Sequence, residues 1–101
     1  MFRIGLVVEN ETKAETLYKI IYNYTHIPAH RHMRGSSEWH LPLLDLDILC
    51  ACQIRGRRYD LIFYDEKIDS VIIDELFYPC CMNRPKPLKN LLMRMNINEQ
   101  I

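Results

Sequence analysis

The chain has 101 residues, and 49% of them are apolar, which is enough for one compact domain with a single core. Thirteen basic and thirteen acidic residues give a formal net charge of zero, so no overall attraction to nucleic acid or to a membrane surface is expected. The amino terminus shows no signal pattern, and no apolar run approaches about 18 residues, so we expect a cytoplasmic protein whose four cysteines are reduced thiols.

The amino-terminal quarter predicts a strand followed by a helix. Residues 3–8 form a short apolar run with β-branched side chains, which is typical of a strand. Thr12 and Glu15 have the spacing of a capping box, which predicts that Thr12 caps the helix. Apolar side chains then recur at helical spacing, namely Ala14, Leu17, Tyr18, Ile21 and Tyr24. We therefore expect a helix through Tyr24.

Residues 26–40 predict an exposed loop, with a short strand inside it as an alternative, because a proline, a glycine and two serines interrupt any periodicity. Four histidines lie in this segment, but Arg31 and Arg34 lie among them, and positive charge beside a metal ion is unfavourable. We expect a solvated or phosphate-contacting loop with His30, Arg31 and Arg34 as binding candidates. Trp39, the only tryptophan, is either a plug of the core or an exposed anchor for a partner.

The middle of the chain leaves two alternatives open. Residues 44–48 alternate between apolar and acidic side chains, which favours a strand with Asp45 and Asp47 on its wetter face. A helix is the alternative, because apolar side chains of the same region also share a helical face. Cys50 and Cys52 lack the spacing of a metal-binding pair, and we expect both to be buried as small apolar residues.

Residues 59–64 form the best strand candidate in the chain. They follow a polar turn at residues 53–58 and end in Asp65 and Glu66. A nearly unbroken apolar run is typical of a buried parallel strand, and α/β proteins bind ligands just beyond the carboxyl ends of such strands. We therefore expect Asp65 and Glu66 at a ligand-binding edge.

Two helices are expected after this strand. Residues 71–76 are compatible with a strand or a helix, and the acids at their start and Pro79 after them favour a short helix. A terminal amphipathic helix is predicted by apolar residues at i, i+3, i+4 and i+7, namely Leu88, Leu91, Leu92 and Met95. The predicted fold is a single α/β domain over residues 1–101, with a small, mainly parallel sheet flanked by helices in a Rossmann-like arrangement of two or three layers.

Residues 54–66 resemble the Walker B region of phage terminase large subunits and helicase-type ATPases, in which an Arg-Gly turn leads into an apolar strand that ends in Asp-Glu. Residues 4–18 are similar to the strand, turn and helix before that region, and parts of residues 75–85 are similar to the segment after it. The resemblance implies that Asp65 holds a Mg²⁺-bound water shell and that Glu66 activates the attacking water.

The phosphate loop of those ATPases is missing from this chain. The only glycines of this chain are Gly5, Gly35 and Gly56, and none is followed by lysine. We therefore expect a non-catalytic regulatory or binding protein without a cofactor, encoded by a phage or mobile element and built from a remnant of a terminase- or helicase-like core. It would act in the host cell cytoplasm, without a membrane, through a protein partner or a homo-oligomer. An ATPase fragment that a partner completes is one alternative.

Residues 59–65 also resemble the third strand of response-regulator receiver domains, whose terminal Asp accepts phosphate. This resemblance implies that Asp65 is the phosphoacceptor and that Glu9 belongs to the acidic cluster that holds Mg²⁺. Lys86 followed by proline is similar to the Lys-Pro pair near the end of that fold. An atypical receiver-like signalling domain is therefore a further alternative.

Charge is unevenly distributed along the second half of the chain. Residues 60–75 carry six acids and one lysine, whereas residues 84–94 carry four bases and no acid, which predicts two oppositely charged faces. Arg55, Arg57 and Arg58 form the densest basic cluster. This turn either contacts the phosphate backbone of a nucleic acid, or Arg57 and Arg58 are solvated while Arg55 pairs with a neighbouring acid.

Overall fold

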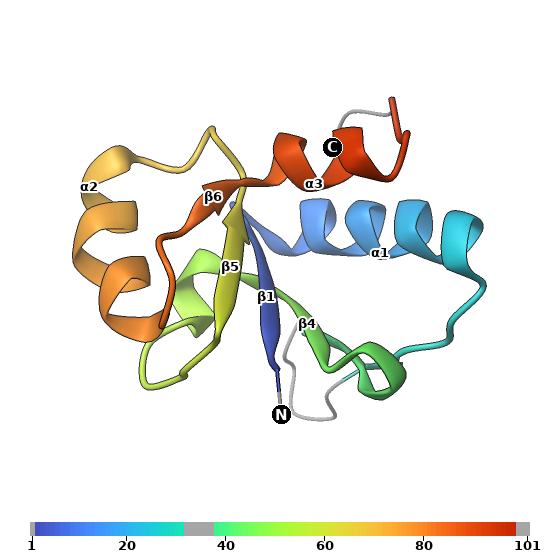
Figure 1. The fold of residues 1–101 in the computed structure, drawn as a ribbon, viewed down its shortest axis with the longest axis horizontal. Helices are drawn as coiled ribbons and strands as arrows, with labels where there is room; N and C mark the ends of the chain where they lie inside the picture. Colours follow the sequence, from blue (N-terminus) through green and yellow to red (C-terminus); the bar gives the residue numbers. More distant parts are fainter. Residues whose placement is uncertain (1, 32–37, 99–101) are drawn as a thin grey trace.

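A single sheet with helices on both of its faces makes up the computed structural model, which describes residues 2–31 and 38–98 (Figure 1). Within the described residues the sheet has six strands in the order β2-β3-β4-β1-β5-β6. The strands are β1 (Ile4–Val8), β2 (His30–Arg31), β3 (Trp39–Leu41), β4 (Leu46–Cys50), β5 (Leu61–Tyr64) and β6 (Lys86–Pro87).

Strand directions in the sheet confirm the prediction of a small, mainly parallel α/β fold. β4, β1, β5 and β6 are parallel to one another. β3 runs antiparallel to both of its neighbours, β4 and β2. The predicted strand at residues 59–64 is confirmed for Leu61–Tyr64, which lies beside β1 inside the sheet, whereas Tyr59 forms only an isolated bridge with Cys81.

One face of the sheet is covered by α1 (Glu11–Thr25) and α3 (Leu88–Arg94), as Figure 1 shows. Both helices were predicted from their apolar periodicity. This face buries a cluster that includes Leu6, Leu17, Ile21, Ile48, Phe63, Leu88 and Leu92. Full burial of each large apolar side chain contributes about 1.5–3 kcal/mol, so these helices hold their face mainly by hydrophobic contact.

The other face is covered by one continuous helical segment made of α2 (Ser70–Ile72), the π-helical turn η3 (Ile73–Phe77) and the 3₁₀ turn η4 (Tyr78–Cys80). This confirms the helical alternative for residues 71–76. Ile73 and Phe77 pack against the sheet in a second buried cluster with Val7, Leu49 and Ile62. Two further 3₁₀ turns, η1 (Pro42–Leu44) and η2 (Ala51–Gln53), flank β4.

The connections between the parallel strands explain why helices lie on both faces. The chain passes from β1 to β4 through α1 and then crosses back over β1 to reach β5 and β6. Crossovers that travel in opposite directions keep the same hand only if they use opposite faces. The chain therefore places α1 on one face and the α2–η4 segment on the other.

Two predicted details of the first half are corrected. α1 begins at Glu11 rather than after Thr12, because Asn10 is the cap and its side-chain oxygen accepts from the Lys13 backbone N–H at 3.0 Å. The predicted loop contains β2 and the first two residues of β3, which confirms the alternative of a strand inside it. Trp39 of β3 stacks on Tyr18 of α1 with ring centroids 4.3 Å apart, which agrees with the core alternative for this residue.

The region around β4 corrects three more predictions. The strand begins at Leu46, and Asp45 adopts a positive φ of 50° in the turn before it. Asp47 is buried rather than on a wetter face, because helices or side chains cover both faces of this inner strand. Cys50 is buried as predicted, but Cys52 is exposed because it lies in the η2 turn after the strand.

Gly5 is the position at which the ring of Tyr59 approaches the sheet. A Cβ atom added to Gly5 would lie 3.2 Å from the Tyr59 ring. Gly5 pairs with Asp47 on one side and with Ile62 on the other. The missing side chain therefore makes room for Tyr59 to lie across β1.

Replacing Gly5 with alanine should lower the free energy of unfolding by about 1–3 kcal/mol, because the added Cβ overpacks the Tyr59 ring. Urea unfolding followed by circular dichroism measures this change. In a Tyr59→Ala background the same replacement should have little cost, since the obstructing ring is gone. An equal loss in both backgrounds would show that the ring is not the cause.

Candidate functional site

The two predicted acids lie at the carboxyl edge of the sheet, as expected. Asp65 and Glu66 follow β5 directly, and Glu9 follows the neighbouring strand β1. Because Val7 pairs with Tyr64, the residues that follow β1 and β5 lie next to each other at this edge of the sheet. Asp65 is only 7% exposed, whereas Glu9 and Glu66 are exposed.

Lys13, from the first turn of α1, lies between these carboxylates. Its ammonium group contacts Glu9 Oε1 and lies 3.3 Å from Asp65 Oδ2. The hydrogen bond from Lys13 to Glu9 raises the pKa of Lys13, and partial burial opposes this shift. The hydrogen bond to Asp65 and the negative charges of Asp65 and Glu9 raise this pKa further. A Mg²⁺ ion at Asp65 and Glu9 would have to displace the Lys13 ammonium group.

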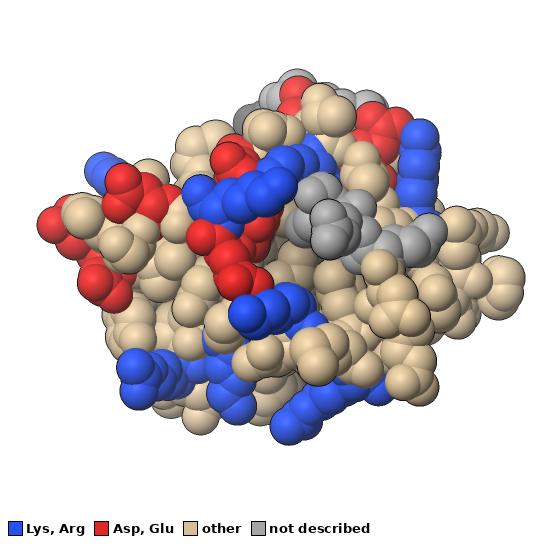
Figure 2. Space-filling view, turned by 90° about the horizontal axis from the view of Figure 1, so that it is seen from above, with Lys and Arg blue, Asp and Glu red and all other residues tan. Residues whose placement is uncertain are grey.

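Further contacts fix the same edge. Asp65 Oδ1 accepts from the Lys67 backbone N–H at 3.1 Å, and Lys89 of α3 lies 3.2 Å from Glu66 Oε2 in an exposed ion pair. Seen from above this edge, acidic and basic side chains are interleaved over the middle of the molecule, and more acids gather on the α2 side (Figure 2). The carboxyl-edge cluster is therefore a set of paired charges.

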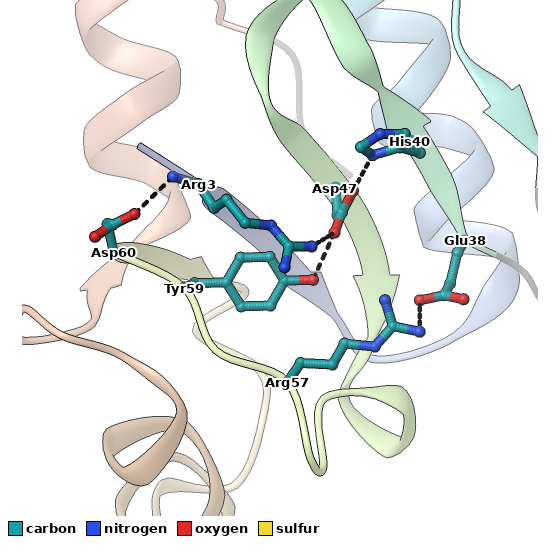
Figure 3. A network of polar contacts seen from close by, with 7 residues as sticks. All are labelled: Arg3, Glu38, His40, Asp47, Arg57, Tyr59 and Asp60. Atoms are coloured by element: carbon teal, nitrogen blue, oxygen red, sulfur yellow. Dashed lines mark hydrogen bonds and ion pairs between the residues drawn. The ribbon is translucent and has the colours of Figure 1, made fainter. Parts of the chain in front are cut away.

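A second polar site, which was not predicted, lies near the amino ends of the strands on the α2 face. Asp47 is 5% exposed, and its carboxylate receives side chains from three other segments of the chain (Figure 3). Oδ2 accepts from Tyr59 Oη at 2.8 Å and from Arg3 Nη2 at 3.0 Å. Oδ1 contacts Nδ1 of His40, the residue opposite Asp47 on β3. We call this group the Asp47 network.

Tyr59 contacts both β1 and β4 in this network. Its ring lies over Gly5, and the Arg3 guanidinium lies 5.1 Å from the ring centroid in a cation–π contact. Burial raises the pKa of the Tyr59 hydroxyl well above its usual value, and the charge and hydrogen bond of Asp47 raise it further. The nearby Arg57 guanidinium opposes this shift. The hydroxyl is therefore held as a donor to Asp47.

A pocket of about 220 Å³ opens beside this network. It is lined by Arg3, Glu38, His40, Asp47 and Arg57. Arg57 extends from the turn before β5 and forms an ion pair with Glu38, which is 5% exposed (Figure 3). The pocket therefore combines two guanidinium groups and an imidazole with two buried carboxylates.

The predicted arginine turn is divided by the structure. Arg57 enters the pocket, whereas Arg55 and Arg58 are exposed on the turn, in which Gly56 has a φ of 81°. Arg58 Nη2 lies 3.6 Å from Met82 Sδ. The second alternative for this turn assigned the acid pairing to the wrong arginine, because Arg57 forms the ion pair with Glu38 and Arg55 is exposed.

The predicted binding loop is described only in part. His30 pairs with His40 across β2 and β3, next to the pocket. Arg31 belongs to β2, but its side chain and the whole of Arg34 lie outside the described residues. The sequence contained one signal for the second site, which is the acidic residue Asp47 within a predicted strand. The burial of Asp47 depends on partners that sequence spacing does not show.

Comparisons with known proteins add no relative to this description, because no family model, curated protein or solved structure matches the chain. Among the residues that the structure describes, no helix is long and apolar enough to cross a bilayer. The same residues contain no group of three or more His, Cys, Asp or Glu side chains arranged to hold a metal ion. The site has therefore to be interpreted from its own geometry.

The network predicts a specific loss of stability at alkaline pH. Because the folded-state pKa of Tyr59 is raised above the usual value of 10.0, its contribution is complete below that pH and is lost as pH rises toward the folded-state pKa. Urea unfolding across this range should show a difference between wild type and Tyr59→Phe that shrinks as pH rises. Lys13 and Cys81, whose pKa values are also raised, contribute equally to both proteins. A constant difference, or the same trend in exposed Tyr24→Phe, would contradict the assignment.

Proposed function

We propose that the protein is a non-catalytic interaction module, and that its binding surface is the solvent side of the α2–η4 segment together with Met82, two residues beyond it. We call this the α2–η4 surface. It is defined by four large apolar side chains, Val71, Ile72, Tyr78 and Met82, which are 56%, 38%, 40% and 67% exposed. This exposure is the observation that carries the proposal, because grouped apolar side chains on a charged surface are typical of interaction sites.

The four residues lie close together in the chain. Val71, Ile72 and Tyr78 belong to the helical segment, and Met82 follows two residues after its end, beyond the extended Cys81. Ile73 and Phe77 point the other way and are buried against the sheet. The segment therefore buries some of its apolar side chains against the sheet and exposes others to solvent.

Local backbone geometry also supports a functional role for this segment. Residues Ile73–Phe77 form a π-helical turn inside it. π-helical turns are rare in proteins and occur frequently at functional sites. This turn changes the helical register between Val71 and Tyr78, and so determines which side chains face the solvent.

The charges around the surface indicate the chemistry of its partner. Asp69, Asp74 and Glu75 are exposed around Val71 and Ile72, and Figure 2 shows acidic side chains gathered on the α2 side. Arg84 and Arg58 contact Tyr78 and Met82 at the other end of the surface. Complementary charge favours a partner that carries Lys or Arg around an apolar stripe. We therefore infer that the partner is a basic amphipathic helix of another protein, bound by its apolar side.

The turn after β1 supports a role without nucleotide hydrolysis. Phosphate-binding α/β proteins present the backbone N–H groups of a helix start to the anion. Here the Asn10 side chain takes up the Lys13 N–H, and Glu9 and Asp65 bring negative charge to the same place. Descent from a terminase- or helicase-like core, a phage or mobile-element origin and a cytoplasmic location are compatible with this role and stay predictions.

A synthetic leucine–lysine amphipathic peptide tests the proposed surface. It should bind the protein more tightly than a leucine–glutamate peptide of the same pattern, as measured by fluorescence anisotropy. The double replacement Val71→Ser with Ile72→Ser should weaken the leucine–lysine complex about tenfold or more, since two buried apolar contacts are lost. Met93→Ser, which removes a 70% exposed side chain from α3, is the matched control and should bind as wild type.

Two results would overturn the proposal. One is equal affinity of wild type and the Val71/Ile72 double variant for the leucine–lysine peptide. The other is a dimer in analytical ultracentrifugation that the same double variant converts to a monomer, because the surface would then serve a second copy of the chain.

A receiver-like signalling domain is a second candidate, and the strand order favours it. Taken along the chain, the parallel strands β1, β4, β5 and β6 are arranged as 2-1-3-4, which is the start of the flavodoxin-like, doubly wound order. Ligands of such Rossmann-like sheets bind at the switch point next to the first strand, here between β1 and β5. Asp65 lies there with Lys13 at 3.3 Å, so an acceptor carboxylate and a cation are in contact.

If this candidate is correct, acetyl phosphate with Mg²⁺ should add one phosphoryl group, detected by intact-mass spectrometry. Asp65→Asn should abolish the added mass, because an amide cannot form the acyl phosphate. Asp69→Asn, an exposed acid on the next turn, is the matched control and should retain it. Labelling that persists in Asp65→Asn, or no labelling of wild type, would exclude Asp65 as a phosphoacceptor.

A further inference from the structure

We propose that the pocket between Arg3 and Arg57 binds the phosphate group of a small phosphomonoester. This site lies near the amino ends of the parallel strands, apart from the carboxyl edge, and goes beyond the proposed protein-binding role. The residues that line it come from the segment before β1, from the start of β3, from β4 and from the turn before β5. The fold therefore brings together four separate segments of the chain.

The exposed chemistry of the pocket consists of donors. The side chains of Asp47 and Glu38 are 8% and 7% exposed, whereas those of Arg3 and Arg57 are 45% and 32% exposed. Each guanidinium group is oriented by one of the buried carboxylates and has five N–H groups in a fixed plane. The carboxylates therefore contribute little exposed surface to the pocket, and the two arginines contribute much more.

His40 adds a donor or acceptor on the same side. Its Nδ1 contacts Asp47 Oδ1, and its side chain is 41% exposed. A carboxylate on one ring nitrogen fixes the ring orientation, so that Nε2 is the nitrogen available to a ligand. Two guanidinium groups and an imidazole thus converge on one small space, which matches the three terminal oxygens of a phosphate group.

The balance of charge also favours an anion. Arg3 and Arg57 are each paired with one carboxylate, so these four side chains together carry no net charge. The exposed Arg55 and Arg58 add two positive charges on the adjoining turn. Asp60, the other acid beside Arg3, accepts from the Arg3 backbone N–H at 2.7 Å. Arg55, Arg58 and Asp60 together therefore add one net positive charge beside the pocket.

Size distinguishes a small ligand from a polymer. A volume of about 220 Å³ lies below the range of about 300–1,000 Å³ that is typical of sites for drug-sized molecules. It accommodates a phosphate with a small organic group. A nucleic-acid backbone would instead require a line of cations along an open surface, whereas here the donors converge on one point.

Nuclear magnetic resonance titration tests the site with phenyl phosphate and inorganic phosphate as probes. Both should shift the side-chain signals of Arg3, Arg57 and His40 in a saturable way. Arg57→Lys keeps the positive charge beside Glu38 but loses the planar fork, so its Kd for phenyl phosphate should rise about fivefold or more. Arg94→Lys, the same change at the end of α3, should leave the Kd unchanged.

The spectra also separate the outcomes. A backbone spectrum of Arg57→Lys that retains the wild-type pattern shows that the variant is folded. If Arg57→Lys does not fold, Arg3→Lys provides the second test, with the same expected loss. Absence of saturable shifts at the pocket residues, or equal affinity in the Arg→Lys pocket variants and wild type, would overturn the proposal. So would tighter, steeply salt-dependent binding of a single-stranded oligonucleotide centred on Arg55 and Arg58.

Discussion

The buried charge of Asp47 is the constraint on which the amino-terminal end of the sheet depends. A carboxylate in an otherwise apolar inner strand is stable only if donors surround it, since an uncompensated buried charge costs several kcal/mol. Its donors are Arg3, His40 and Tyr59, which precede β1, belong to β3 and precede β5. Satisfying one charge therefore fixes three neighbouring segments relative to β4. The same contacts orient Arg3 and His40 toward the pocket, so the stability of this end and its binding chemistry have one origin.

The fold was predictable wherever a local pattern determines the structure. Strand β1, helices α1 and α3 and most of β5 follow from apolar periodicity within short segments. The strand order was not predictable, because it depends on which segments pair across the sheet. Strand β6 is two residues long and includes Pro87, so it leaves no periodic signal. The cap of α1 was misplaced because Asn10 and Thr12 are both favourable capping residues, and the length of the preceding strand decides between them.

The site was predictable in position at one edge of the sheet and not at the other. Asp65 and Glu66 were located by the rule that ligands bind beyond the ends of parallel strands. The Lys13 contact with Asp65 joins residues 52 positions apart, which no spacing rule reveals. Asp47 was assigned to a wetter face because alternation usually marks a half-exposed strand. In this protein the covering groups on that face are Tyr59 and Arg3, and Arg3 is 44 positions away in the sequence.

The shortness of the two outermost strands affects how copies of this chain behave at high concentration. β2 and β6 each contain two residues, and Pro87 has no N–H to offer to another strand. Short edge strands that carry charge or proline resist extension of the sheet by a second molecule. The apolar segments with the strongest tendency toward amyloid-like stacking, β1 and β5, lie between other strands in the described sheet. They become available to neighbouring molecules only when the domain opens, so resistance to aggregation should follow the stability of the fold.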